Sequence, residues 1–240
     1  WITDKHYLHD LVSSDRRNPT VNPYGLLYGS PEYSADLIPM LDPVKNVATT
    51  FKGTVRDAEM PLNLGPGHAA GLDPTMPSPY WGNERIWETR VNNHNSMFGR
   101  DGKVWMAASV RGAENPAFCR QGSEHPSAKA QPMDRAVRHL AVLDPKTQKY
   151  TYVDTCFSTH HPQFGYDANE TIWASTGGGG GNVGWINTKM LDETGDIEKS
   201  QGWTALVLDT NGNGKRDDYT EPNQPFDPSK DRRLGPTFYA

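Results

Sequence analysis

The chain has 240 residues, enough for one large domain or two small ones with a buried core. Its 23 glycines and 19 prolines favour many turns and short strands. A formal net charge of -5 argues against a nucleic-acid partner, because phosphate binding needs clustered Lys and Arg. No apolar run approaches the roughly 18 residues that span a bilayer, so we expect no membrane span.

The first segment, residues 1–51, is expected to be the end of one repeated unit. It opens with Trp1 and later contains Met-Leu-Asp-Pro at 40–43, which indicates a strand followed by a turn. No signal peptide precedes Trp1, so we expect that any targeting signal has been removed or lies outside this sequence.

Residues 52–87 form a long insertion rich in Pro, Gly and Met, and they include His68. Loops of this length are commonly functional lids or binding surfaces. A structural excursion that covers the edge of a sheet is the alternative interpretation.

Two later segments, residues 88–153 and 154–234, repeat one order of residues. In each, a His stands four residues before a Phe, an Asp follows three residues after the Phe, then a Trp, and much later a Val-Leu-Asp turn signal. The first set is His94, Phe98, Asp101, Trp105 and the turn at 142–144, and the second is His160, Phe164, Asp167, Trp173 and the turn at 207–209. We therefore predict three related units, the first of which lacks its beginning.

The alternating apolar runs and Asp-Gly, Asp-Pro and Asn-Gly turns predict an all-β chain, with one short helix over 187–193. Repeats of this kind are typical of β-propeller blades, and a β-sandwich with accidental similarity is the alternative. We expect about three blades, with residues 235–240 starting the next one. Since three blades cannot close, the remaining blades of a larger propeller, such as one of seven, would come from the same protein or a partner chain.

Metal binding is predicted at His94 and His160, because equivalent residues of neighbouring blades would both face the central channel. His161 and His68 are further candidate ligands. Imidazole ligands suit zinc, copper or iron better than calcium. The alternatives are a metal-free binding or general-base role, or histidines that only hydrogen-bond the channel lining.

A calcium site is predicted in the segment 209–218, which follows the first half of an EF-hand loop, Asp-x-Asn-x-Asn-Gly. Its candidate ligands are Asp209, Asn211, Asn213, Asp217 and Asp218. Position twelve, which is Glu in that pattern, is Thr220, and Glu221 comes one residue later. The alternative is a turn whose side chains hydrogen-bond its own backbone.

Cys119 and Cys156 are the two cysteines, and we predict that they form a disulfide, with two buried free thiols as the alternative. A disulfide is typical of an oxidising compartment, so we expect a periplasmic or secreted protein.

Two further patterns are interpreted as structural. The glycine-rich segment 177–184 lacks the helix of a nucleotide-binding loop and is expected to permit close backbone approach. Charged residues around His94 are expected to form ion pairs, although they could position a polar substrate; these are Glu88, Arg90, Arg111 and Glu114.

The repeat consists of a turn, then Gly-x-[Val/Ile]-Trp, and later Leu-Asp-Pro. This pattern resembles that of the streptogramin lyase (virginiamycin B lyase)-like β-propeller superfamily. The segments around His94 and His160 are similar to uncharacterised bacterial secreted propeller proteins associated with a carboxypeptidase-regulatory-like domain. The lyase resemblance implies a channel-mouth histidine, either His94 or His160, and a divalent metal. After its Trp this chain has Met-Ala-Ala at 106–108 and Ala-Ser-Thr at 174–176, where the lyases usually have Phe-Thr-Glu.

Two functions are expected from these features. The first is part of an extracytoplasmic propeller enzyme, a metal-dependent lyase or oxidoreductase, with its metal at the histidines. The second is a non-catalytic binding or interaction module stabilised by calcium and a disulfide. A small molecule or a polysaccharide would be the ligand.

Overall fold

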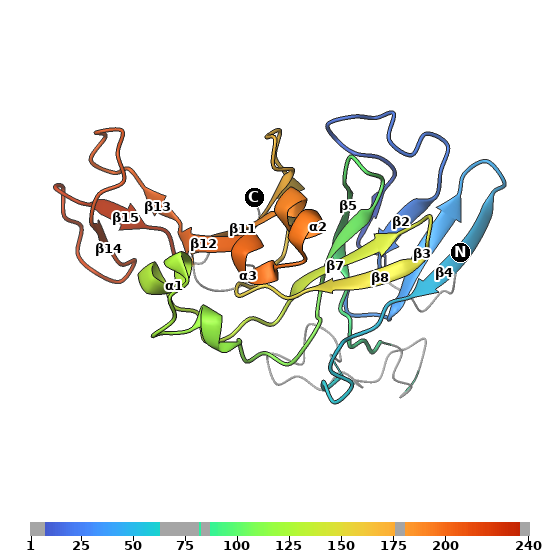
Figure 1. The fold of residues 1–240 in the computed structure, drawn as a ribbon, viewed down its shortest axis with the longest axis horizontal. Coiled ribbons are helices and arrows are strands. Elements are labelled where there is room, and N and C mark those ends of the chain that lie inside the picture. The colour runs from blue at the N-terminus through green and yellow to red at the C-terminus, as the bar shows by residue number, and fades with distance from the viewer. Residues whose placement is uncertain (1–7, 63–81, 83–86, 176–180, 236–240) are drawn as a thin grey trace. The chain divides into compact units, whose positions relative to one another are not determined.

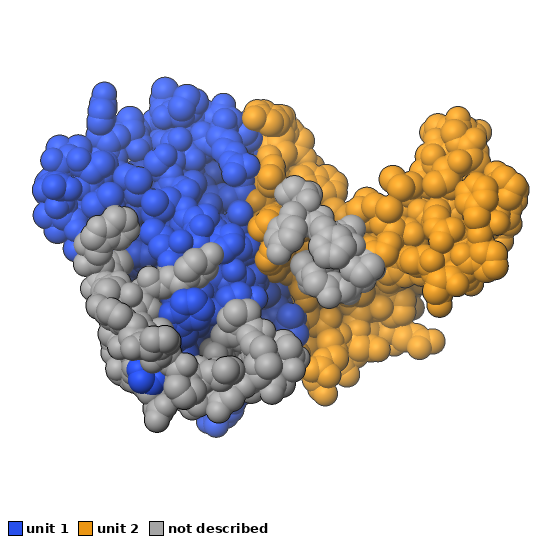
Figure 2. Space-filling model, turned by 180° about the vertical axis from the view of Figure 1, so that it is seen from behind, with its two compact units in different colours: residues 1–112, 137–154 blue, residues 113–136, 155–240 orange. Residues whose placement is uncertain are grey.

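The computed structural model describes residues 8–62, 82, 87–175 and 181–235 (Figure 1). Trp1, His68 and residues 177–180 and 236–240 lie outside this part of the chain, as does most of the insertion at 52–87. The chain divides into two compact units, which are described separately (Figure 2). Unit 1 is Trp1–Gly112 with Val137–Asp154, and unit 2 is Ala113–Ala136 with Thr155–Ala240.

Unit 1 contains two four-stranded antiparallel sheets, and in each the strands follow their order in the chain. The first sheet comprises β1 (Asp10–Val12), β2 (Leu27–Ser30), β3 (Leu37–Asp42) and β4 (Val47–Lys52). The second comprises β5 (His94–Phe98), β6 (Val104–Ala108), β7 (His139–Asp144) and β8 (Lys149–Val153).

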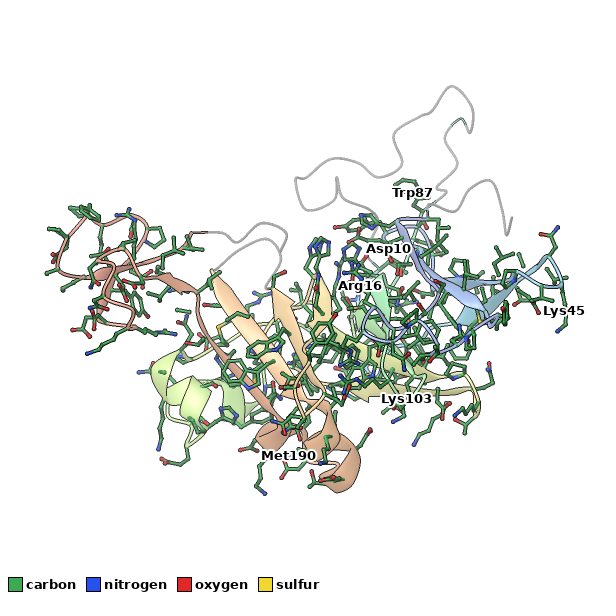
Figure 3. The ribbon with its side chains drawn as sticks, turned by 90° about the horizontal axis from the view of Figure 1, so that it is seen from above. Asp10, Arg16, Lys45, Trp87, Lys103 and Met190 are labelled. Atoms are coloured by element: carbon green, nitrogen blue, oxygen red, sulfur yellow. A yellow bond between two sulfur atoms is a disulfide. The ribbon has the colours of Figure 1, made fainter. Side chains whose placement is uncertain are left out.

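The predicted Leu-Asp turns end the third strand of both sheets. The carboxylate of Asp42 accepts hydrogen bonds from the backbone N–H groups of Val44 and Lys45, and Asp144 accepts one in the same way from Lys146. Asn46 and Gln148 each lie four residues after the Asp of their turn. Their positive φ angles of 57° and 58° close the turn. Lys45 lies in the turn between β3 and β4 (Figure 3).

The core of unit 1 lies between its two sheets. Tyr28 of β2 packs edge-on against Phe98 of β5, with ring centroids 5.7 Å apart. Both side chains are almost completely buried. The other buried members of this cluster are Ile38, Met40, Val104, Met106 and Leu143. Burial of this apolar surface holds β1 and β2 against β5.

Unit 2 contains a third four-stranded antiparallel sheet, followed by a smaller one. The larger sheet comprises β9 (Pro162–Phe164), β10 (Thr171–Ser175), β11 (Asn182–Asn187) and β12 (Gln201–Ala205). The smaller sheet comprises β13 (Val207–Leu208), β14 (Tyr219–Thr220) and β15 (Asp231–Arg233), with β14 and β15 parallel.

Unit 2 also contains four short helical segments. They are η2 (Ala117–Cys119), α1 (Pro126–Ala130), α2 (Thr188–Thr194) and α3 (Ile197–Ser200). The helix predicted over 187–193 is confirmed as α2, which carries Met190 (Figure 3). The Asn187 side chain caps it by accepting a hydrogen bond from the Met190 N–H, and Gly195 ends it in the left-handed conformation.

The predicted repeat is confirmed in the pairing of the first two strands. Phe98 lies opposite Val104, one residue before the Trp of β6, and Phe164 lies opposite Ile172, one residue before the Trp of β10. In both hairpins the Gly after the Phe donates its N–H across the turn, to Lys103 or to Thr171. Equivalent residues therefore occupy equivalent sheet positions.

One other match within the repeat is wrong, and the match at Trp1 lies outside the described residues. Val207 and Leu208 form β13 in the smaller sheet, because β11 already occupies the third position beside β10. The fold is all-β with few helices, and the arrangement of its sheets as propeller blades stays a prediction.

Candidate metal site

His94, the first residue of β5, is completely buried in unit 1. It pairs with Ala107 of β6, and the register then shifts between His94 and Met97. Asn95, within this bulge, has a φ of 47°. A bulge bends its strand and redirects the neighbouring side chains. This local distortion sets the direction of the His94 imidazole.

Two polar residues at the start of β1 approach His94. The imidazoles of His9 and His94 meet edge to face, with centroids 4.4 Å apart. The Asp10 carboxylate lies 3.1 Å from His9 Nδ1 and 4.0 Å from His94 Nδ1. One ligand atom from each of these three residues lies within 4.8 Å of the others. These dimensions allow a single ion to contact all three.

The Asp10 carboxylate is fixed by the same bulge. Asn95 and Ser96 donate their backbone N–H groups to its two oxygens, over 3.1 Å and 3.4 Å. Ser96 also donates its N–H to the Ser30 hydroxyl. Two strands that are distant in the sequence, β1 and β5, are thereby joined at the candidate ligands.

Glu32 approaches the same nitrogen of His94 as Asp10, with its carboxylate oxygen 3.2 Å from Nδ1. Its second oxygen accepts a hydrogen bond of 2.6 Å from the buried Arg138 guanidinium. Burial raises the pKa of Glu32, but the hydrogen bond from His94 and the charge of Arg138 lower it by more, to about 2. A carboxylate beside a ring nitrogen of a metal-binding histidine commonly fixes the orientation of the imidazole.

This arrangement supplies two imidazoles and one carboxylate as donors. Such sets bind zinc in hydrolytic sites and iron(II) in non-haem oxygenases, whereas calcium prefers oxygen ligands only. His9 is partly exposed and Asp10 is a quarter exposed, so solvent reaches one side of the group. We call His9, Asp10 and His94 the β1–β5 group.

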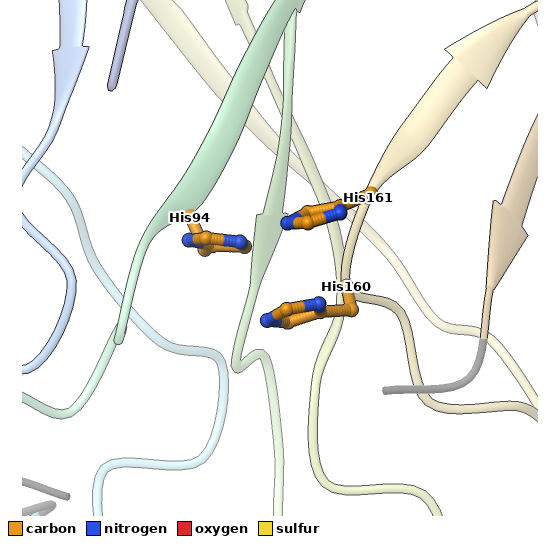
Figure 4. A group of neighbouring side chains, drawn as sticks. All are labelled: His94, His160 and His161. Atoms are coloured by element: carbon orange, nitrogen blue, oxygen red, sulfur yellow. The ribbon is translucent and has the colours of Figure 1, made fainter. Parts of the chain in front are cut away.

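The other predicted histidine ligands belong to unit 2. His160 and His161 precede β9, and their rings stack with centroids 4.2 Å apart. Figure 4 shows His94 carried by β5 and these two side chains carried by the segment that leads into β9. Shared binding of one ion by His94, His160 and His161 stays a prediction.

The disulfide prediction is confirmed, because Cys119 and Cys156 are bonded within unit 2. Of the charged residues around His94, Arg111 donates a 2.6 Å hydrogen bond to Asp154, and Arg90 donates to the carbonyl of Met60. Glu114 is exposed and pairs with Arg120. Arg111 and Glu114 are thus engaged in ion pairs, as expected.

The predicted calcium ligands gather in one exposed turn of unit 2. The Asp209 carboxylate accepts the backbone N–H groups of Gly212, Asn213 and Gly214. The Asp217 carboxylate accepts from the Asn211 and Asn213 amides, which lowers the pKa of Asp217. Hydrogen bonds within the turn are what the alternative interpretation expects, and they also bring the candidate ligands together.

Sequence reasoning missed His9, Asp10, Glu32 and Arg138. The sequence signal for His9 and Asp10 was their adjacent position before Leu-Val at 11–12. A single His-Asp pair of this kind is common by chance. The pairing of β1 with β2, and their packing against β5, brings these residues to His94. His9 and Asp10 are more than eighty positions from His94 in the sequence, and Glu32 is 62 positions from it.

Comparisons with protein-family models, with curated proteins and with solved structures return no match to this chain. Within the described residues, no helix is long and apolar enough to cross a membrane.

Proposed function

We propose that this chain is part of an extracytoplasmic β-propeller protein that binds a divalent transition metal, with His94 as a central ligand. Zinc, iron or copper is the proposed metal, and a lyase or oxidoreductase reaction is the proposed use. The superfamily resemblance and the repeat of His94 and His160 favour this class. The disulfide favours a periplasmic or secreted location.

The observation that carries the proposal is the β1–β5 group. His9, Asp10 and His94 offer ligand atoms within 4.8 Å of one another, in a single compact unit. Two imidazoles and a carboxylate suit a borderline divalent ion. His160 and His161, predicted from the sequence alone, are proposed as further ligands.

The neighbouring residues have supporting roles in this proposal. Glu32 orients His94 through Nδ1, and Arg138 balances the charge of the Glu32 carboxylate. Backbone N–H groups of Asn95 and Ser96 hold Asp10. A bound divalent metal would supply Lewis acidity or, with iron or copper, redox chemistry.

Elemental analysis of chelator-washed protein, reloaded with zinc, iron(II) or copper(II) and then desalted, tests the proposal. We expect about one ion per chain in the wild type and less than a tenth of that in His94→Ala. His125→Ala is the matched control, because it removes an unrelated imidazole that stacks on Trp203 in unit 2. Circular dichroism establishes that each variant is folded.

The same measurement separates the two proposed functions. If wild type and His94→Ala hold equal amounts of transition metal, the histidine site is wrong. The non-catalytic binding module is then the better account. A loss of metal in the double variant His160→Ala with His161→Ala would support the two further ligands, and full retention would remove them from the site.

A further inference from the structure

A second candidate cation site lies in unit 2, in the loop between β13 and β14 of the smaller sheet. We call residues 209–218 the Asp-Asn turn. Gly212 and Gly214 have φ angles of 75° and 74°, which let the backbone turn tightly around the polar side chains of this segment. The turn alone is a set of exposed polar side chains, so a cation site needs a further observation.

That observation is Asp231, the first residue of β15. Asp231 is only 1% exposed. Its Oδ2 accepts a 2.8 Å hydrogen bond from the backbone N–H of Asp217, within the Asp-Asn turn. Its Oδ1 is buried and has no hydrogen-bond partner among the described residues. A buried carboxylate with an unsatisfied oxygen is costly unless a cation compensates it.

The backbone holds the Asp231 carboxyl group toward the turn. Asp231 donates its N–H to the carbonyl of Asp218, over 3.0 Å. The Thr210 hydroxyl, near the other end of the turn, donates to the carbonyl of Lys230. Tyr219 and Asp231 are also partners in the parallel pair of β14 and β15. Both ends of the turn are therefore anchored beside Asp231.

Asp231 also lies where it can supply the carboxylate that the sequence pattern lacks. In an EF-hand loop, Glu at position twelve supplies the last carboxylate, and Thr220 occupies that position here. An acidic side chain that arrives from a neighbouring strand can provide the missing oxygens. In this chain the neighbouring strand is β15, and the side chain is Asp231.

We propose that Asp231 completes a calcium site in the Asp-Asn turn, together with Asp209, Asn211, Asn213 and Asp217. The oxygen-only donor set selects a hard cation, and its flexible loop suits calcium better than magnesium. The Asn211 and Asn213 amides, which donate to Asp217 in this structure, turn their oxygens toward the ion when it binds. The site stabilises unit 2.

Isothermal titration calorimetry of chelator-washed protein with calcium chloride tests this proposal. We expect one calcium ion per chain in the wild type, and an affinity about tenfold or more lower in Asp231→Asn. Asp227→Asn is the matched control, because Asp227 is a partly exposed neighbour whose carboxylate accepts from Ser229. It is expected to bind calcium like the wild type.

Thermal unfolding of the same proteins gives an independent readout. Asn at 231 keeps an acceptor for the Asp217 N–H and removes the buried charge, so the metal-free variant is expected to melt at or above the wild-type temperature. Calcium is expected to raise the melting temperature of the wild type and leave that of Asp231→Asn nearly unchanged. Calcium binding by His94→Ala is expected to equal that of the wild type.

Failure to bind calcium in the wild type, or equal affinity in Asp231→Asn, would overturn the proposal. Asp209→Asn is a second variant in an exposed turn, should Asp231→Asn fail to fold. It is expected to weaken calcium binding by a similar factor, and unchanged binding there would be equally contradictory. Equal affinity for magnesium chloride would contradict the assignment to calcium.

Discussion

Buried charges in unit 1 occur in close pairs. Arg138 contacts Glu32 at 2.6 Å, and Arg17 contacts Asp15 at 3.0 Å, with all four side chains less than a tenth exposed. Removing one partner of such a pair leaves an uncompensated charge in a medium of low polarity. The Arg138 pair has an additional consequence, because Glu32 also positions the imidazole of His94.

Arg138→Met is expected to lower the free energy of unfolding by about 3 kcal/mol, because Glu32 then remains buried without its cation. Urea denaturation measures the change. The same variant is expected to bind transition metal more weakly, since Glu32 no longer holds one position beside His94. A loss below about 0.5 kcal/mol would show that the pair is not a determinant of stability.

Lys45→Met is the matched control for this prediction. Lys45 pairs with Asp42 at 3.2 Å, but its side chain is 77% exposed. Exposed ion pairs contribute little because water solvates both charges. The free energy of unfolding is expected to change by less than about 0.5 kcal/mol, and metal binding is expected to be unchanged.

At the scale of elements, the larger sheet of unit 2 depends on two glycines that face aromatic rings. A Cβ atom on Gly184 of β11 would lie 2.2 Å from the Phe157 ring, and one on Gly202 of β12 would lie 2.3 Å from the Trp185 ring. Real Cβ atoms do not approach so closely, so only Gly fits without a shift of the ring. Gly181 similarly allows close approach to the Leu234 carbonyl.

Gly184→Ala is expected to destabilise unit 2 by about 2 kcal/mol, because Phe157 is fully buried and must move. Gly112→Ala is the control, because an added Cβ there meets no atom within 4 Å. Thermal melts of both variants measure the difference. Equal stability of the two would mean that the Phe157 ring moves at no cost.

The sequence predicted turns and helix ends correctly where a side chain hydrogen-bonds the backbone of nearby residues. The Asp101, Asp144 and Asp167 turns and the capped helix α2 follow from side chains that bond the nearby backbone. The match at 207–209 failed because short strand-and-turn signals do not specify the partner strand. Which strand pairs with which depends on contacts that are distant in the sequence.

At the scale of the whole molecule, unit 2 is built from two separate stretches of chain. The disulfide links them, because Cys119 belongs to Ala113–Ala136 and Cys156 to the stretch from Thr155. It closes a sequence separation of 37 residues. Asn115 adds a hydrogen bond to the carbonyl of Cys156 beside it. The bridge therefore stabilises the assembly of this unit.

The double variant Cys119→Ser with Cys156→Ser is expected to lose about 4 kcal/mol of stability in unit 2, as loop-closure entropy predicts for this separation. Amide hydrogen exchange measures the two units separately. Faster exchange is expected in β9–β12, with little change in β5–β8. Unchanged exchange in β9–β12 would contradict a stabilising role for the disulfide.

The sequence predicted the all-β class and singled out His94 as a candidate ligand, but it could not predict which residues surround His94. His94 emerged from its register with His160, a local pattern that recurs. His9 and Asp10 reach it only through strand pairing and the bulge at Asn95. Asp231 was missed for the same reason, since β14 and β15 bring it to a turn that precedes it by more than ten residues.

The most direct test of the account is anomalous diffraction from crystals of the zinc-loaded protein, collected at the zinc absorption edge. The account predicts a peak about 2.0–2.2 Å from a ligand atom of each of His9, Asp10 and His94. A zinc peak bound elsewhere, with no anomalous signal at these three side chains, would contradict it.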